Sequence, residues 1–212
     1  MQKIFILFGK PGAGKGTRLG EFLEGKEGIF EVLSVGNLLR KARKEQTELG
    51  KQAESYMNSG ALVPDEIINA IVIDGLRNAN KPIIIDGFPR TVGQAAAMLE
   101  AGVLPHNVIE LYVDDEVVIQ RAKDRIVCGG CGEPYTTNDF KPPKTHGVCD
   151  KCGGTLVRRT DDEEDVVKER LRVYQEQTYP VVKFLGDNGV KIYTIDNSSP
   201  ASREKFSECM NA

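Results

Sequence analysis

The sequence lacks several features that mark particular classes of protein. No apolar run is long: the run at residues 4–8 stops at Gly9, so it is too short for the core of a signal peptide or for a membrane span. A basic surplus is also missing, because 28 Lys and Arg stand against 31 Asp and Glu. Proteins that bind the nucleic-acid backbone usually carry such a surplus. We therefore expect a cytoplasmic protein that binds neither membranes nor nucleic acids.

Machinery for covalent catalysis is missing too. The only two histidines, His106 and His146, lie in loop-like segments, and the sequence offers no Ser-His-Asp or Cys-His arrangement. Internal repeats and low-complexity linkers are likewise absent. With 212 residues, the chain is long enough for one full domain that carries small inserted lobes.

The N-terminal apolar run leads into a glycine-rich loop that contains a lysine. Residues 9–17 read Gly-Lys-Pro-Gly-Ala-Gly-Lys-Gly-Thr, which includes the Gly-x-x-x-x-Gly-Lys pattern of a phosphate-binding loop. Glycines let main-chain N–H groups approach phosphate oxygens, and Lys15 would neutralise the β- and γ-phosphates at the start of a helix. Gly16 replaces the usual Ser or Thr, and Thr17 follows one residue later. A chance surface turn would not combine a preceding strand, a following helix and this lysine, so the loop predicts nucleotide binding.

Strand-like and helix-like segments alternate along the rest of the chain, which predicts a doubly wound α/β fold with a parallel sheet. Buried strands are expected at residues 4–8, 82–87, 108–113 and 191–195, with a fifth near Val32. Ligands of such sheets bind beyond the carboxyl ends of the strands. Asp86, at the end of the second of these segments, should therefore lie near the glycine-rich loop.

Two stretches interrupt this alternation. Residues 31–63 hold polar helices with few large apolar side chains, which indicates a thin lobe. Residues 126–160 are rich in glycine, proline and cysteine and indicate a compact insertion. The acidic residues 161–165 then begin a long helix, which we expect to end or kink near Pro180.

The insertion contains two Cys-x-x-Cys pairs, Cys128 with Cys131 and Cys149 with Cys152. Two such knuckles can present four thiolates in a tetrahedron, which suits a closed structural zinc site. Cobalt or iron could occupy the same sulfurs. Two disulfides are disfavoured by the expected compartment, and a redox pair is disfavoured because there are two matched copies. Cys209 stands alone and is expected to be an unliganded thiol.

Arginines are the other recurrent feature. A single arginine is usually a solvated surface residue, but several lie beside turns or element ends next to the predicted loop, namely Arg40, Arg90, Arg121, Arg125, Arg159 and Arg170. Converging guanidinium groups are typical of a clamp for two polyphosphates. A phosphate monoester acceptor is already an anion at neutral pH, so it needs alignment and charge neutralisation rather than a general base. Water would compete for the donor, so a closing lid is expected.

Taken together, these residues resemble the adenylate kinase family, in its bacterial form with a long metal-binding lid, over essentially the whole chain. The glycine-rich loop matches the family's own variant, in which glycine follows the lysine. Val35 and Asn37 stand where the family commonly has Thr and Asp. Further similar segments are residues 34–40 (Ser-Val-Gly-Asn-Leu-Leu-Arg), 60–63 (Gly-Ala-Leu-Val) and 86–91 (Asp-Gly-Phe-Pro-Arg-Thr), the last being the most specific.

The resemblance implies a P-loop nucleoside monophosphate kinase fold, with a five-stranded parallel sheet, helices on both faces and two inserted lobes. It also implies a monomer that transfers a phosphoryl group reversibly from MgATP to AMP, giving two ADP, by in-line displacement. A UMP/CMP kinase, a GTP-dependent AMP kinase and a zinc-knuckle protein that uses its loop as a nucleotide switch are the alternatives. The implied division of the chain is a core of residues 1–33, 64–123 and 162–212, an AMP-binding lobe of 34–63 and a lid of 124–161.

The resemblance assigns roles to individual residues as well. The catalytic set would be Lys15, Asp86, Arg90, Arg125, Arg159 and Arg170, with Asp86 orienting Mg²⁺ through water. The ATP-binding set would be Gly12, Ala13, Gly14, Lys15, Gly16, Thr17, Arg121 and Arg125. The AMP-binding set would be Val35, Arg40, Leu62, Val63, Gly87, Arg90, Gln94, Arg159 and Arg170, with the Gln94 amide reading the base. Structural Zn²⁺ would be held in the lid by Cys128, Cys131, Cys149 and Cys152.

Overall fold

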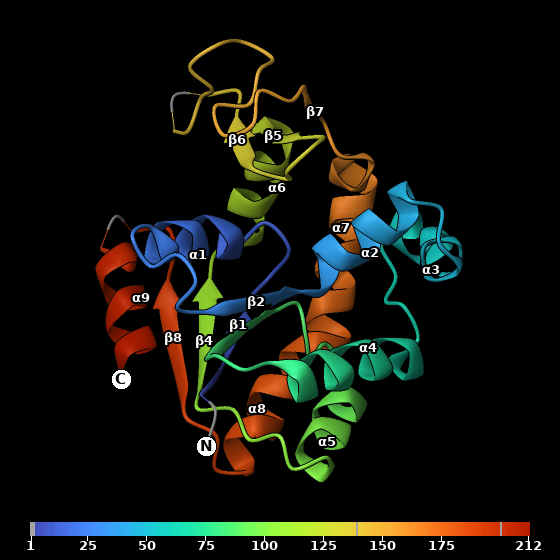
Figure 1. Cartoon of the computed structure of the whole chain (residues 1–212), viewed down its shortest axis with the longest axis vertical. Helices are drawn as coiled ribbons and strands as arrows, with labels where there is room; N and C mark the ends of the chain where they lie inside the picture. The colour runs from blue at the N-terminus through green and yellow to red at the C-terminus, as the bar shows by residue number, and fades with distance from the viewer. Residues whose placement is uncertain (1–2, 139, 200) are drawn as a thin grey trace.

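The computed structural model describes residues 3–138, 140–199 and 201–212. Within them, a five-stranded sheet with the order β2-β3-β1-β4-β8 forms the centre of the molecule (Figure 1). Every neighbouring pair in this sheet is parallel. The strands are β1 (Ile4–Phe8), β2 (Glu31–Ser34), β3 (Ile83–Asp86), β4 (Asn107–Tyr112) and β8 (Ile192–Asp196). The predicted doubly wound sheet, including the fifth strand near Val32, is confirmed.

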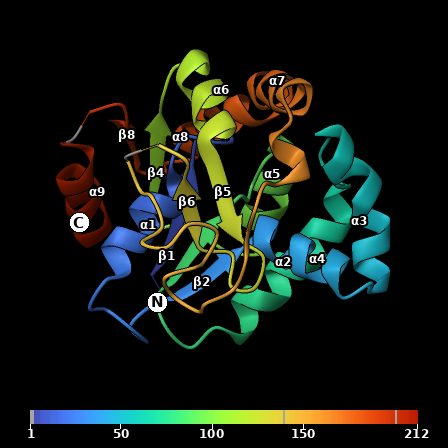
Figure 2. The same ribbon diagram turned by 90° about the horizontal axis from the view of Figure 1, so that it is seen from above.

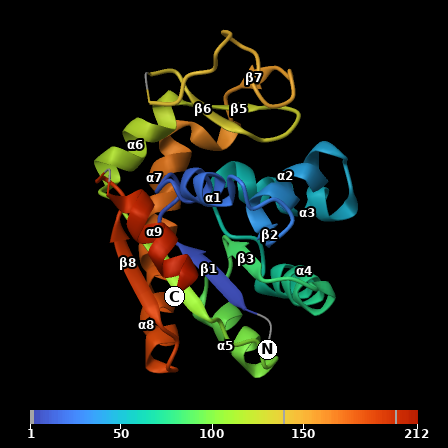
Figure 3. The same ribbon diagram turned by 60° about the vertical axis from the view of Figure 1, so that its left-hand side comes forward.

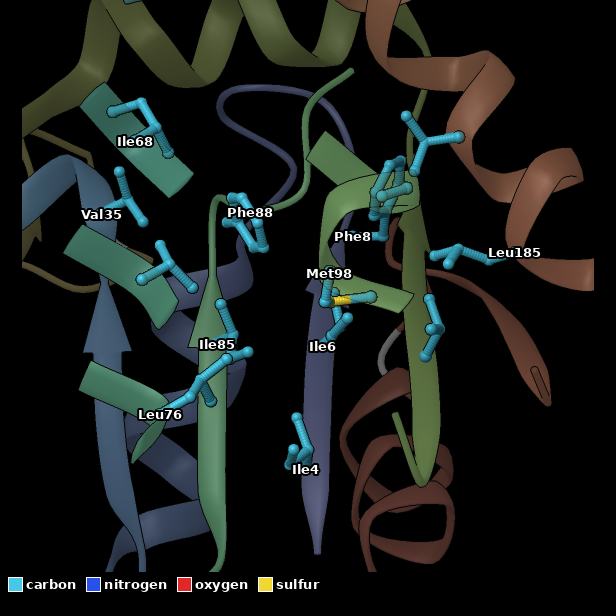
Figure 4. Packing of buried hydrophobic residues seen from close by; sticks show 14 of the residues in the cluster. Ile4, Ile6, Phe8, Val35, Ile68, Leu76, Ile85, Phe88, Met98 and Leu185 are labelled. Atoms are coloured by element: carbon cyan, nitrogen blue, oxygen red, sulfur yellow. The ribbon is translucent and has the colours of Figure 1, made fainter. Parts of the chain in front are cut away.

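The central strands are mostly apolar because both faces of the sheet are covered. All of β1 is buried, and its side chains alternate between two hydrophobic clusters, with Ile4, Ile6 and Phe8 on one face and Phe5 and Leu7 on the other. This alternation is the period-2 geometry of a strand, and burial on both faces is typical of parallel sheets. Figure 4 shows the first face, where Met98 and Leu185 from the covering helices pack beside these side chains.

Helices lie on both faces of the sheet (Figure 3). One cluster packs side chains of α4 (Asp65–Asn78), α5 (Val92–Glu100) and α8 (Tyr179–Asp187) against the sheet. The other packs side chains of α1 (Lys15–Leu23), α6 (Asp115–Asp124), α7 (Glu164–Val173) and α9 (Ser202–Asn211). Among the described residues, no helix is both long enough and apolar enough to cross a membrane.

The two stretches that interrupt the alternation lie at the carboxyl edge of the sheet. Helices α2 (Val35–Lys44) and α3 (Glu48–Ser59) pack against each other on one side, where a Cβ on Gly50 would clash with the carbonyl of Ala42. The cysteine-rich stretch forms a separate antiparallel sheet of β5 (Arg125–Cys128), β6 (Pro134–Thr136) and β7 (Leu156–Val157). Figure 1 shows this small sheet above the central one, and Figure 2 views the molecule from that side.

The long helix predicted after the insertion is continuous but changes its winding. A short 3₁₀ turn, η1 (Thr160–Asp162), precedes α7, and a π-helical segment, η2 (Tyr174–Thr178), joins α7 to α8. In η2 the Tyr179 N–H donates to the Tyr174 carbonyl, and Pro180 follows at once. The irregularity expected near Pro180 is thus a π-helical turn, a feature often found at functional sites.

Candidate functional site

A cleft of about 850 Å³ opens between the carboxyl edge of the central sheet, the α2–α3 pair and the small sheet. Every residue predicted to bind nucleotide lines this cleft except Ala13, which is fully buried. The predicted residues that line it are Gly12, Gly14, Lys15, Gly16, Thr17, Val35, Arg40, Leu62, Val63, Asp86, Gly87, Arg90, Gln94, Arg121, Arg125, Arg159 and Arg170. Segments far apart in the sequence therefore meet at one place.

The glycine-rich loop turns sharply between β1 and α1. Gly9, Gly12 and Gly14 all have positive φ, at 133°, 83° and 91°. At Gly14 a Cβ would lie 2.5 Å from the Asn197 amide nitrogen, so only glycine fits there. Helix α1 begins at Lys15 with no side chain capping it, which leaves its first N–H groups directed at the cleft.

Lys15 folds back over this loop. Its Nζ donates to the Gly9 carbonyl at 2.6 Å and to the Lys10 carbonyl at 3.0 Å. Burial lowers the pKa of Lys15 to about 8, and Asp86 partly opposes this effect. Lys10, by contrast, turns away from the cleft and pairs with Asp115 at 2.5 Å. Lys15 is thus the loop cation that faces the cleft.

Asn197 holds the loop from behind and was not predicted from the sequence. It is 4 % exposed, its Nδ2 donates to the Ala13 carbonyl at 2.6 Å, and its Oδ1 accepts from Arg18 Nε at 2.7 Å. Arg121 donates to the carbonyls of Ala13 and Asn197 at 3.3 and 2.9 Å. The available signal was the position of Asn197 just after β8, at the carboxyl edge of the sheet.

Asp86 and Arg90 lie on the segment that follows β3. Asp86 pairs in register with Leu7 of β1, so its carboxylate lies beside the glycine-rich loop, as predicted, and it accepts from Ser34 Oγ at 3.3 Å. Arg90 Nε donates to the Gly87 carbonyl at 2.9 Å. Burial, followed by the charge of Arg170, lowers the pKa of Arg90 to about 10.

Gln94 is buried, and two protein partners hold its side chain. Its Oε1 accepts from the Arg90 N–H at 2.7 Å, and its Nε2 donates to Asp65 Oδ1 at 2.8 Å. Asp65 was not predicted as a site residue, and no local motif marks it. Leu62 and Val63 border the same side of the cleft and supply apolar surface.

A second group of arginines gathers around Asp161. Arg170 Nη1 donates to Asp161 Oδ2 at 2.9 Å, and Arg40 lies 3.9 Å from the same oxygen. Burial raises the pKa of Asp161, but the arginines, Arg170 first, more than offset this and hold it below its usual value. Asp161 therefore remains ionised, and it links Arg40 of α2 to Arg170 in the last turn of α7.

Arg125 and Arg159 differ in how they are partnered. Arg125 forms an ion pair with Asp162, with Nε 2.8 Å from Oδ2, and this pair raises its pKa despite the opposing effect of burial. The Nε of Arg159 is buried and has no hydrogen-bond partner among the described residues. Burial, then the charges of Arg40 and Arg125, lower the pKa of Arg159 to about 10. A buried, unpaired guanidinium nitrogen indicates room for an anionic ligand.

The four cysteines come together at the far end of the small sheet. Their Sγ atoms all lie within 4.8 Å of one another, with Cys128 and Cys152 at 3.4 Å and Cys131 and Cys149 at 3.6 Å. The N–H groups of Gly130 and Cys131 donate to the Cys128 sulfur. Tyr135 Oη accepts from the Asp150 N–H and lies 3.5 Å from the Cys149 sulfur, which lowers the pKa of Cys149 to about 6. These sulfurs could hold a metal ion.

The cleft thus combines a phosphate-binding loop with buried cations and an apolar border, and comparison with known proteins agrees. The family model described as "Adenylate kinase" matches residues 7–190. Proteins named adenylate kinase from Caldicellulosiruptor saccharolyticus and Fervidobacterium nodosum are 40% and 42% identical to this chain over 206 and 197 residues. These alignments cover 94% of both chains in the first case, and 90% of this chain and 88% of the relative in the second.

A third relative of the same name, from Geobacter sp., is 44% identical over 191 residues, which is 87% of this chain and 88% of the relative. These names do not favour the alternatives of a UMP/CMP kinase, a GTP-dependent AMP kinase or a zinc-knuckle switch protein. The chain belongs to the adenylate kinase family, whose members are nucleoside monophosphate kinases.

Proposed function

We propose that the cleft catalyses reversible transfer of a phosphoryl group from ATP to AMP, giving two ADP, by in-line displacement. The observation that carries this proposal is the set of partly buried cations around the cleft. Among the described residues, Arg159 keeps an unpaired buried nitrogen, and the Arg90 side chain donates a hydrogen bond only to the Gly87 carbonyl. Buried guanidinium groups without carboxylate partners are costly unless an anion is bound. Two nucleotide phosphate chains would supply that anionic charge.

On the donor side, ATP would bind at the glycine-rich loop. The N–H groups of residues 12–17 and the Lys15 ammonium would hold its β- and γ-phosphates, at the positive end of α1. Arg121 is already fixed against the Ala13 and Asn197 carbonyls, which places it at the mouth of the loop. Arg125, held by Asp162, would approach from the small sheet.

On the acceptor side, Arg40 and Arg90 would grip the AMP phosphate. Arg40 Nη2 donates to Asn37 Oδ1 at 2.7 Å, which orients the guanidinium on α2. Leu62 and Val63 would border the adenine, and Gln94 would read its edge; Val35, Gly87, Arg159 and Arg170 complete the proposed set.

No protein base is needed for the chemical step. The phosphate of AMP has a second pKa near 6, so at neutral pH one of its oxygens is already an anionic nucleophile. The residues would align this oxygen with the γ-phosphorus, and Lys15, Arg125, Arg159 and Arg170 would stabilise the charge on the transferred group. Water would be excluded by closure over the cleft.

Mg²⁺ is the expected partner of ATP. The oxygen ligands near the glycine-rich loop, the Asp86 carboxylate with Ser34 Oγ beside it, are of the hard kind that this ion prefers. When bound, Mg²⁺ would neutralise phosphate charge. We propose that Asp86 orients it through water.

We propose a structural Zn²⁺ for the cysteine cluster. Four thiolates whose sulfurs all lie within 4.8 Å of one another suit tetrahedral coordination, and such a four-thiolate site would leave no open position for catalysis. Among the described residues, the hydrophobic cluster of the small sheet has three buried members, Cys128, Tyr135 and Cys149, so the ion would add stability to a small apolar core. Residues 124–161 would be a lid, residues 34–63 an acceptor lobe, the rest a core, and the protein a monomer.

The test is a coupled assay that detects ADP from ATP and AMP, with UMP and CMP as other acceptors and GTP as another donor. Arg90→Ala should lower kcat by at least about a hundredfold, as loss of a positioned charge in a transition state does. Arg172→Ala is the control for loss of an arginine charge outside the cleft, because Arg172 is exposed and paired with Glu169 and Glu176. No ADP from ATP and AMP, or equal losses in both variants, would contradict the proposal.

A further inference from the structure

The Gln94 amide is fixed by a chain of contacts that starts at Asp65. Asp65 Oδ1 accepts from Gln94 Nε2 at 2.8 Å, and Asp65 Oδ2 accepts from Thr91 Oγ1 at 2.6 Å. The Thr91 hydroxyl in turn accepts from the Gln94 N–H at 3.0 Å, which caps α5. One carboxylate therefore contacts both the first turn of α5 and the side chain of Gln94.

These contacts permit only one orientation of the amide. A carboxylate can only accept, so it selects the NH₂ group of Gln94; the Arg90 N–H can only donate, so it selects Oε1. Turning the amide by half a turn would place two donors together at Arg90 and two acceptors together at Asp65. Both contacts would be lost and replaced by repulsion.

The carboxylate can approach α5 because a glycine lies there. A Cβ on Gly93 would be 3.1 Å from Asp65 Oδ2. Asp65 is the first residue of α4, and Pro64 alone separates it from the 60–63 segment that lines the cleft. It therefore connects the apolar border of the acceptor side with Gln94, while Glu66, next to it, is exposed.

We propose that Asp65 is a specificity-determining positioning residue, which fixes the order of donor and acceptor that Gln94 presents to the acceptor base. The inference rests on the proposed function, in which Gln94 faces the AMP base. After its two protein contacts, Gln94 keeps one N–H and one oxygen lone pair. A 6-aminopurine offers the matching N1 acceptor and N6 donor, whereas a 6-oxopurine offers the reverse order, so Asp65 selects against the oxo base.

The test compares AMP with IMP as acceptor, at saturating ATP, through the ratio of their kcat/KM values. Asp65→Ala should lower the ratio of kcat/KM for AMP to kcat/KM for IMP by about tenfold. Without the carboxylate, the Gln94 amide can adopt either orientation and can therefore hydrogen-bond with either base. Asp65→Asn, which offers Gln94 a partner in either orientation, should lower this ratio by about threefold, and it serves if the alanine variant does not fold. In both variants the KM for AMP should rise while the KM for ATP stays unchanged.

Two controls separate positioning from a general structural role. Glu66→Ala should keep the wild-type ratio, because its side chain is exposed. In a Gln94→Ala background, Asp65→Ala should leave the ratio unchanged, since Asp65 acts through Gln94. A residue with only a structural role would lower the melting temperature and the rates with both acceptors alike, and an unchanged ratio in the Asp65 variants would overturn the inference. A wild-type protein that fails to use AMP would instead overturn the proposed function.

Discussion

Replacing Asn197 with alanine should weaken ATP binding selectively. The Asn197 side chain makes two hydrogen bonds. Its Nδ2 donates to the Ala13 carbonyl of the glycine-rich loop at 2.6 Å, and its Oδ1 accepts from Arg18 Nε at 2.7 Å. In the part of the chain that the structure describes, the other group that donates to the Ala13 carbonyl is Arg121, at the longer distance of 3.3 Å. Without the Asn197 side chain, the loop loses the hydrogen bond that connects it to the segment after β8.

The expected magnitude follows from the two contacts that are lost. A neutral hydrogen bond contributes about 1 kcal/mol and one to a charged group about 1.5–3 kcal/mol, so Asn197→Ala should reduce the free energy of unfolding by about 2–4 kcal/mol. For a chain of this size, that corresponds to a fall in melting temperature of about 5–15 °C. A loosened loop should also raise the KM for ATP about tenfold and leave the KM for AMP unchanged.

The matched control is Asn107→Ala. Asn107 is also buried, and its Nδ2 donates to the Cys209 carbonyl at 2.9 Å, but it lies at the start of β4, away from the cleft. By the same scale it should lose about 1 kcal/mol of stability, for one hydrogen bond to a neutral group, without any change in the KM for ATP. If both variants raised this KM equally, or if neither did, the role assigned to Asn197 in holding the loop would be refuted.

Two further predictions concern the metal and pH. If the four-cysteine cluster holds the proposed structural metal, a thiol-competing chelator should lower the melting temperature by roughly 10 °C, and Cys209→Ser should respond as the wild type does. A chelator-treated protein of undiminished stability would exclude a structural ion. Because burial lowers the pKa of Lys15 to about 8 while an unfolded chain keeps its lysine protons to about 10.5, the unfolded state binds more protons between these values. Between pH 8 and pH 10, the free energy of unfolding of the substrate-free protein should therefore rise relative to that of Lys15→Met. Urea denaturation at each pH measures this difference. If the free energies of the two proteins changed in parallel with pH, the prediction would be contradicted.

The parts of the site that the sequence predicts are those whose chemistry is local. A buried strand, three glycines with positive φ and Lys15 lie within one short stretch, so spacing alone gives the loop. The same holds for the cysteine pairs, because each knuckle places its two sulfurs together. The three central strands were predictable because parallel strands buried on both faces are mostly apolar, whereas the edge strands β2 and β8 are only partly buried and more polar.

Asn197 and Asp65 could not be predicted in this way. Asn197 contacts a loop residue 184 positions away, and Asp65 contacts Gln94 across 29 positions. Neither lies in a repeated or spaced pattern, and both residue types are common on surfaces. Their roles depend on which helix packs beside which strand, and only the three-dimensional arrangement reveals that.

The charge of the cleft connects its geometry to its expected motion. Lys15, Arg90 and Arg159 have pKa values lowered toward 8 to 10 by burial and by neighbouring cations, so the arrangement repels itself when no anion is present. Asp161 and Asp162 offset part of this repulsion, and both lie where the small sheet joins α7. Bound phosphate groups would cancel the remaining repulsion. They would bind more tightly to a closed conformation, in which these cations lie close together, than to an open one, so nucleotides should shift the population toward the closed conformation. If full closure required both nucleotides, the cations that stabilise phosphoryl transfer would come together only when AMP is bound. ATP would then not be hydrolysed by water in the absence of AMP, a selectivity that the proposed mechanism without a protein base requires.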